Sequence, residues 1–204
     1  MKTGYIPGKD TTYKMEVLIM ELQEAILKRR SVRKFTDEPV SDDELKQIFE
    51  AVRWSPSWAN TQVWEFIVVR DRATIEAVTG TYTEKNPATK CSLAASALIV
   101  ACAKTNISGC YDGKESTSLK NWYMFDLGIA VQTLCLKAHE MGLGTVIVGL
   151  MNHEACKKIL AVPEGREVVA VIPVGKPVLP LREGPPRKTV AEMVYKDKYG
   201  QAIF

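Results

Sequence analysis

Five cations and one hydroxyl lie close together in the segment Lys28-Arg29-Arg30-Ser31-Val32-Arg33-Lys34. Guanidinium groups bind phosphate oxygens through paired hydrogen bonds, and a serine hydroxyl can donate one more. The segment therefore indicates a phosphate site. The alternative is a solvated basic helix end, which would complement the negative end of a helix dipole.

A second segment, Ser55-Pro56-Ser57-Trp58-Ala59-Asn60-Thr61-Gln62-Val63-Trp64, is rich in amide and hydroxyl groups. Asn60 and Gln62 each offer donors and an acceptor, which suits a heterocycle whose edge alternates C=O and N–H groups. The segment lies between an expected helix and an expected strand, where loops often bind ligands. The alternative is a turn flanked by two core tryptophans.

Two further segments could bind a ligand, one through its backbone and one through its side chains. Gly142-Leu143-Gly144-Thr145-Val146-Ile147-Val148-Gly149 would let the chain approach a flat ligand closely, and Arg187-Lys188 could close on a phosphate. The glycines flank a strand and lack the G-x-G-x-x-G spacing of a dinucleotide-binding turn, and the chain has no P-loop sequence. Both nucleotide-binding folds are therefore excluded. The alternative for Arg187-Lys188 is a charged tail.

The side chains offer little acid–base, covalent or metal chemistry. His139 and His153 have no nucleophile at a known motif spacing, and His139 is expected to be exposed. Two histidines and five cysteines without C-x-x-C spacing predict no metal site and reduced thiols, hence a cytoplasmic protein. The longest apolar run, 93–103, is about half of the ~20 residues of a membrane span. If the protein is an enzyme, a cofactor must supply the chemistry.

The elements that must position these segments alternate between helix and strand. Apolar spacing predicts helices over 17–28, from Ser41 to before Pro56, over 119–141, over 152–160 and near 190–194. Short apolar runs predict strands over 65–69, 97–102, 145–148 and 168–174. This alternation predicts one α+β or α/β domain over 1–204, with a flexible arm at 1–14 and a tail at 180–204 that packs on a partner subunit. A net charge of +3 is too small to indicate nucleic acid or an anionic membrane.

Taken in order, these segments resemble the nitroreductase family of flavoenzymes. Arg29-Arg30-Ser31-Val32-Arg33-Lys34-Phe35 is similar to the family's R-R-S-x-R-x-F, and Pro56-Ser57-x-x-Asn60-x-Gln62-x-Trp64 is similar to P-S-x-x-N-x-Q-P-W. Asp126-x-Gly128-x-Ala130, followed by Gly142-Leu143-Gly144-Thr145 and Gly149, resembles its central helix and the strand after it. The resemblance implies an α+β fold with a mostly antiparallel central sheet flanked by helices. It also implies a long central helix at the interface of a homodimer, which binds two FMN molecules there.

The resemblance further implies a set of cofactor-binding residues, Arg29, Arg30, Ser31, Arg33, Pro56, Ser57, Trp58, Asn60, Gln62, Val146, Ile147, Val148, Gly149, Arg187 and Lys188. Arg29, Arg30 and Ser31 are expected at the phosphate and ribityl end. Arg187 and Lys188 are expected to close on the same phosphate.

At the ring end, the resemblance places Arg33 near N1 and the C2 carbonyl of the flavin. A fixed cation there would stabilise the negative charge of the reduced ring. Ser57, Asn60 and Gln62 are expected to meet the flavin, Ser57 across the dimer interface. The backbone of 146–149 is expected near N5, where hydride enters and leaves.

The implied reaction is ping-pong transfer of two electrons from NADH or NADPH through FMN to a nitroaromatic, a quinone or a similar small acceptor. Alternatives are reductive dehalogenation, flavin modification, a non-catalytic flavin-binding sensor and, from the basic segment, a nucleic-acid module. Three departures from the family pattern bear on the acceptor. Val63 replaces a proline, which could loosen the turn, Trp58 is bulky, and the polar stretch 104–120 lies where the family varies its substrate lid.

Overall fold

A computed structural model describes residues 20–181 and 183–204, so the expected arm at 1–14 lies outside the described residues. The helices are α1 (Leu22–Lys28), α2 (Asp42–Val52), α3 (Arg72–Thr79), α4 (Thr89–Ala94), α5 (Tyr123–Glu140) and α6 (His153–Ile159), with short 3₁₀ turns η1 (Trp58–Asn60) and η2 (Val190–Glu192). The strands are β1 (Trp64–Val69), β2 (Ala97–Lys104), β3 (Cys110–Tyr111), β4 (Lys114–Glu115), β5 (Gly144–Thr145) and β6 (Arg166–Gly175).

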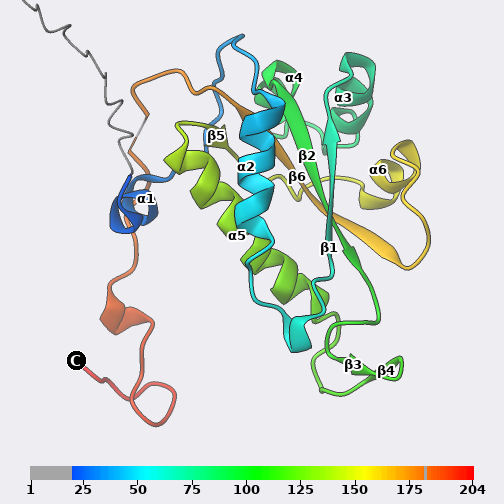
Figure 1. The fold of residues 1–204 in the computed structure, drawn as a ribbon. Coiled ribbons are helices and arrows are strands. Elements are labelled where there is room, and N and C mark those ends of the chain that lie inside the picture. The colour runs from blue at the N-terminus through cyan, green and yellow to red at the C-terminus, as the bar shows by residue number, and fades with distance from the viewer. Residues whose placement is uncertain (1–19, 182) are drawn as a thin grey trace, which may run out of the picture.

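The central sheet has the strand order β1-β2-β6-β5, and each neighbouring pair is antiparallel (Figure 1). This confirms the predicted α+β class with a mostly antiparallel sheet. The predicted strands at 65–69, 97–102 and 168–174 form as β1, β2 and β6 with small changes at their ends. Within the described residues no helix combines the length and apolarity needed to cross a membrane.

The strand predicted over 145–148 is wrong in extent, because β5 ends at Thr145. Thr145 pairs with Val174 and Val148 pairs with Val171, so the same register would place Val146 opposite Pro173. Val148 and Val171 exchange both backbone hydrogen bonds at 2.9 Å, and hydrogen-bonded pairs recur at every second residue of an antiparallel ladder. Proline has no N–H to donate at that position, so the ladder is interrupted there.

The sheet is buried between two helical layers. Alternate residues of β2 face opposite sides: Ala97, Ile99 and Ala101 belong to a core shared with α2 and α5, whereas Leu98 and Val100 belong to a core shared with α3 and α6. A strand covered on both faces must be apolar at successive positions, which explains the uninterrupted apolar run. The small alanines lie on the side where α5 crosses the sheet (Figure 1).

Local end signals set most helix boundaries. Ser41 caps α2 in a reciprocal capping box with Glu44, as predicted, and α2 ends at Val52, before Pro56. Asn152 caps α6 by accepting from the N–H of Ala155, also as predicted. The long helix begins at Tyr123 rather than 119, because Asn121 has a left-handed φ of 58° that a helix cannot contain.

The sequence reading missed two helices and a hairpin of two short strands. Asp71 caps α3 through the N–H of Thr74, and α4 is a single short helix of six residues. Within the polar stretch 104–120, β3 and β4 form a hairpin whose turn is Asp112-Gly113, both at positive φ. This turn chemistry is the usual one for a two-residue hairpin.

Two segments present apolar side chains to the outside of the single chain. In α1, Ala25 is buried, whereas the apolar side chains of Leu22 and Ile26 are 67% and 52% exposed. The tail after 180 runs beside α1 and then away from the sheet, and Figure 1 shows it ending outside the helical layers. Its short turn η2 lies within the predicted range of 190–194. The predicted contact of this tail with a partner subunit stays a prediction.

Candidate functional site

The basic segment is held in place by an edge of the central sheet. After α1 ends, Ser31 forms a parallel bridge with Thr145, and the N–H of Val32 donates to the Thr145 carbonyl at 2.9 Å. Val32 is buried while Ser31 and Arg33 on either side of it are exposed, as the alternation of an extended chain requires. The sheet edge therefore points the hydroxyl and the guanidinium to the open side.

Close packing against β5 fixes the distance between the two segments. A Cβ atom added at Gly144 would lie 2.7 Å from Cγ1 of Val32, so only glycine allows this approach. Gly144, one of the glycines predicted to let the chain approach a ligand closely, brings the backbone against the basic segment.

The basic segment and the tail together enclose a cavity of about 680 Å³. Its lining residues are Arg29, Arg30, Ser31, Val32, Arg33, Lys34, Val178, Pro180, Leu181, Glu183, Gly184, Pro185 and Arg187. Five of these are cations and one is a carboxylate, so the cavity favours an anion. Its volume is that of a pocket for a drug-sized ligand.

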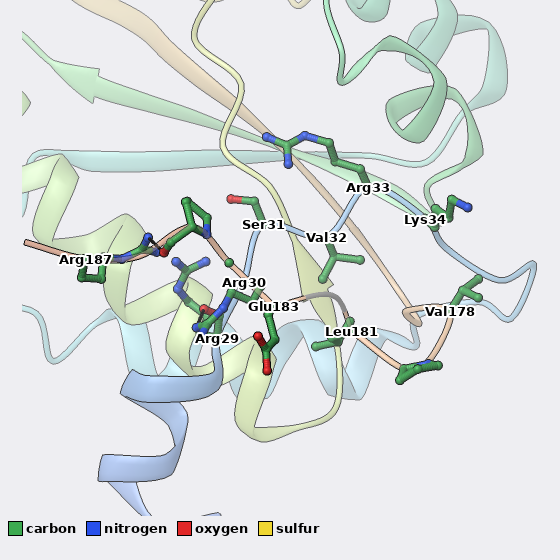
Figure 2. Close-up of a pocket in the computed structure, with 13 residues that line it drawn as sticks. Arg29, Arg30, Ser31, Val32, Arg33, Lys34, Val178, Leu181, Glu183 and Arg187 are labelled. Carbon is green, nitrogen blue, oxygen red and sulfur yellow. Dashed lines mark hydrogen bonds between the residues drawn. The ribbon is translucent and has the colours of Figure 1, made fainter.

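The arginines in this cavity have different surroundings. Arg30 donates to the carbonyls of Leu27 and Arg29 at 2.5 and 2.9 Å, so some of its hydrogen-bond donors are already used at the end of α1. Arg187 donates to the Pro185 carbonyl at 2.8 Å. Figure 2 shows Arg29, Arg30 and Arg187 gathered together, with Arg33 pointing away from them. Lys188, predicted beside Arg187, does not line the cavity.

The tail reaches the site through a close contact. A Cβ at Gly184 would lie 2.8 Å from Nε and 2.9 Å from Cδ of Arg30. The sequence reading missed Gly184, together with Val178, Leu181 and Glu183, which also line the cavity. The turn signal Gly184-Pro185-Pro186 before Arg187 is visible in the sequence, but it does not say against which residues the tail lies.

The amide-rich loop lies elsewhere, at the beginning of α5. The N–H of Trp58 donates to both carboxylate oxygens of Asp126 at 3.1 and 3.2 Å, and the N–H of Gln62 donates to the Ser57 hydroxyl at 3.0 Å. The Gln62 amide donates to the Asn60 side-chain oxygen at 3.0 Å. Pro56, Asn60 and Gln62 are exposed, and Ser57 and Trp58 are half-buried.

The backbone of this loop is strained. Ala59, Asn60 and Gln62 have φ values of 43°, 56° and 45°, a region that residues other than glycine rarely adopt. Such conformations cost on the order of 1–3 kcal/mol each and persist where the surrounding structure imposes them. This concentration of strain marks the loop as a candidate functional element.

The sites formed by the two predicted segments lie at opposite ends of α5. The basic segment contacts the chain just after the helix, and the amide-rich loop binds its first turn. With 18 residues, α5 is about 27 Å long at ~1.5 Å per residue. One chain therefore does not bring its two predicted ligand-binding segments together.

The predicted segment 146–149 does not line the cavity. Val146 and Val148 point into the core, whereas Ile147 and Gly149 are exposed. The segment begins directly after Thr145, so this backbone continues from the edge that holds Ser31.

Comparison with known proteins gives the relationship of the whole chain. The sequence profile of the Nitroreductase family matches residues 26–176. The chain belongs to the nitroreductase family. It is 32% identical over 161 residues to an Archaeoglobus fulgidus protein provisionally named NADH dehydrogenase/NAD(P)H nitroreductase, which covers 77% of this chain and 86% of that one.

Two other relatives agree in sequence and in structure. The chain is 28% identical to the FMN reductase [NAD(P)H] of Bacillus subtilis, over 77% of this chain and 66% of that protein. The crystal structure of a nitroreductase family protein from Clostridium novyi NT superposes with a TM-score of 0.69, at 31% identity, covering 90% of this chain and 97% of that one. The predicted family and fold are thus confirmed.

The stretch 104–120, which was expected where the family varies its substrate lid, packs on the amide-rich loop through Tyr111. Trp58 contacts Trp122 with ring centroids 5.1 Å apart and Tyr111 with centroids 6.4 Å apart. Trp122 in turn contacts Phe125, with centroids 5.6 Å apart. The turn at Val63 is not loose, because Val63 is fully buried and its carbonyl accepts from the N–H of Lys104.

One histidine, His139, lies near enough to the basic segment to be affected by its charges. His139 is half-buried rather than exposed as expected, because it lies on α5 beside α1. Burial lowers its pKa, and the charges of Arg29 and Arg30 lower it further. The described part of the chain has no cluster of three His, Cys, Asp or Glu side chains that could hold a metal ion.

The cysteines are free thiols, and four of the five are buried. Burial raises the pKa of Cys102 to about 12 and that of Cys156 to about 11. Thiols with such pKa values are protonated near neutral pH and are poor nucleophiles. The four buried thiols are therefore poorly suited to covalent or redox chemistry.

Proposed function

We propose that this nitroreductase is an FMN-dependent NAD(P)H oxidoreductase, which passes two electrons to a nitroaromatic, a quinone or a similar small acceptor. The observation that carries the proposal is the cavity between the basic segment and the tail. Guanidinium groups at one end, with the exposed Val178 and the half-buried Leu181 elsewhere in the lining, suit a ligand that joins a phosphate to a less polar part. Membership of the family supports FMN as that ligand.

In this proposal, Arg29, Arg187 and the Ser31 hydroxyl hold the phosphate. The guanidinium of Arg29 makes no hydrogen bond or ion pair with residues in the described ranges, so its side-chain donors are available to a ligand. Arg30 contributes less to phosphate binding, because its guanidinium already donates to two backbone carbonyls. Charge-assisted, two-point hydrogen bonds from arginine match phosphate oxygens well.

FMN, when bound, supplies transfer of a hydride from NADH or NADPH to the acceptor. Arg33 keeps a positive charge away from the other arginines, and this charge would stabilise negative charge that accumulates on a reduced ring (Figure 2). No side chain of the chain needs to act as an acid or a nucleophile, which agrees with the protonated, buried thiols.

We further propose that two copies pair along α5 to complete each site. An isologous pairing whose two-fold axis is perpendicular to α5 places the beginning of one α5 near the end of the other. The amide-rich loop of one copy would then meet the basic segment of its partner, which joins the two segments that α5 separates. A stripe of α5 that includes Phe125, Gly128 and Gln132 is exposed, and so are Leu22 and Ile26 of α1, which leaves apolar surface for such contact.

The tail from 180 onward also exposes apolar side chains that a second copy could cover. Val190, Met193 and Tyr199 are exposed, and Tyr199 is 91% exposed. We propose that this tail packs on the second copy. Sedimentation of the full chain tests the pairing, and a monomer that binds FMN as tightly as the family's dimers would contradict it.

The absorption spectrum of the purified protein, followed by anaerobic titration with NADH and NADPH, tests the function. A bound flavin that is bleached by either nucleotide and reoxidised by menadione supports the proposal. Bound flavin that neither nucleotide bleaches would indicate a flavin-binding sensor. Reoxidation by iodinated phenols alone, or loss of the flavin ring, would indicate the dehalogenating or flavin-modifying alternatives.

A colourless protein that binds no added FMN would refute the proposal. If it were retained on DNA in a salt-dependent manner, the basic segment would be a nucleic-acid site instead.

A further inference from the structure

A buried carboxylate at the start of α5 joins the amide-rich loop to the segment 105–122. Asp126 is 1% exposed. Its two oxygens accept from the N–H of Trp58 at 3.1 and 3.2 Å, and Oδ2 also accepts from the Ser108 hydroxyl at 2.6 Å. No Lys or Arg of the described ranges forms an ion pair with it.

This carboxylate is stabilised by its location. Asp126 lies in the first turn of α5, where the helix dipole favours negative charge. The two hydrogen-bond donors and the helix dipole compensate for the hydration that the carboxylate loses on burial. Without such partners, burial of a charged group would cost too much free energy. In return, Asp126 satisfies the Trp58 N–H and the Ser108 hydroxyl.

The two segments joined by Asp126 also touch through Trp58. Its ring packs on Trp122 and Tyr111, and its indole Nε1 is buried without a partner in the described part of the chain. The ring is thus held by packing and by its backbone N–H, not by a side-chain hydrogen bond. The strained residues Ala59 and Asn60 follow immediately, so loss of the Trp58 N–H bond would let that strain relax.

We propose that Asp126 is a positioning residue that holds the amide-rich loop and the segment 105–122 in one fixed relation. The inference rests on the proposed function, in which Asn60 and Gln62 meet the flavin. Asp126 then sets the position of these amides and of the aromatic residues Tyr111 and Trp122 together. A displacement of the segment 105–122 is transmitted to the amide-rich loop through the hydrogen bonds of Ser108 and Asp126.

The test compares Asp126→Ala with Leu127→Ala. Leu127 is the next residue on α5 and is equally buried, but its side chain makes no hydrogen bond to either segment. Both variants should lower the unfolding midpoint. Only Asp126→Ala should raise the Kd for FMN, by roughly tenfold, the effect of losing a hydrogen bond to a charged group. It should also raise the KM for menadione and change the near-ultraviolet circular dichroism of the Trp58–Trp122 pair in the apoprotein.

Asp126→Asn should rescue most of this loss. Its oxygen can accept from the Trp58 N–H while its amide donates to the Ser108 hydroxyl, which can turn to accept. The proposal is overturned if Asp126→Ala and Leu127→Ala have the same Kd, KM and dichroism.

Ser108→Ala covers the case in which Asp126→Ala does not fold. It removes the bond to the segment 105–122 and keeps the Trp58 bond, so the KM for menadione should rise several-fold while the Kd for FMN stays unchanged. Unchanged values of both constants would overturn the proposal. If the wild-type protein binds no FMN, the proposed function fails, while the dichroism of the apoprotein still decides whether Asp126 fixes the loop.

Discussion

Replacement of Gly144 by alanine should disturb the phosphate end of the site through a single contact. The new Cβ would lie 2.7, 2.8 and 2.9 Å from Cγ1, Cβ and Cγ2 of Val32, whereas carbon atoms in contact prefer about 3.5–4.0 Å. Val32 cannot turn aside, because its own Cβ is one of the close atoms and β-branched side chains are stiff. Its backbone is held by the hydrogen bond to Thr145.

The expected loss of stability follows from two opposing effects. Overpacking of a buried site costs about 1–3 kcal/mol. Alanine also restricts the unfolded chain relative to glycine, which returns about 0.4–1 kcal/mol. The net loss is therefore about 1–2 kcal/mol, or a decrease of roughly 2–8 °C in Tm for a chain of this length.

Urea unfolding of the apoprotein at fixed concentration measures this loss. Gly149→Ala is the matched control, because its Cβ would have only an ordinary contact at 3.9 Å, with the Val169 carbonyl oxygen. Val32→Ala should rescue Gly144→Ala in part, since it removes both Cγ atoms but leaves the Cβ contact at 2.8 Å. A Gly144→Ala protein as stable as Gly149→Ala, or effects of Gly144→Ala and Val32→Ala that simply add, would refute the reasoning.

Three further predictions concern binding, pH and thiol reactivity. Arg29→Ala and Arg187→Ala should each weaken FMN binding by roughly 1.5–3 kcal/mol, whereas Lys188→Ala, outside the cavity, should not; fluorescence titration measures all three, and equal affinities would remove the two arginines from the phosphate site. The pKa of His139 is below its ordinary value of 6.5, so the unfolded chain binds that proton more tightly and the free energy of unfolding should decrease as the pH falls below 6.5. His139→Gln should flatten this decrease below pH 6.5, and an unchanged slope would show that His139 does not cause it. A thiol reagent such as DTNB should modify Cys110 first in the native protein and the four buried cysteines after unfolding; rapid reaction of Cys102 would contradict its raised pKa.

The proposed pairing of two copies would account for several features that look unfavourable in one chain. An extended tail with exposed Tyr199 and a helix with exposed Leu22 and Ile26 would leave apolar surface in water. The same pairing would unite the basic segment of one copy with the amide-rich loop of the other. Association of the two copies would then both bury the exposed apolar side chains and complete the proposed flavin site.

The local sequence determined the elements whose signals lie within a few residues. The Ser41–Glu44 capping box and the Asn152 cap set helix starts, because the groups that bond are three residues apart along the chain. The apolar runs of β1, β2 and β6 predicted strands, because burial on both faces requires apolar residues at every position. The ordered motifs were sufficient to identify the family.

Tertiary structure decided the features that depend on residues distant in sequence. Pro173 shortens β5 only because the register places it opposite Val146, and Gly144 is required only because Val32 lies against it. The sequence contained Asp126 in a motif but did not show that its carboxylate binds Trp58 and Ser108. The separation of the basic segment from the amide-rich loop likewise follows from the length and path of α5. These relations are set by pairing register and packing between elements, for which adjacent residues carry no signal.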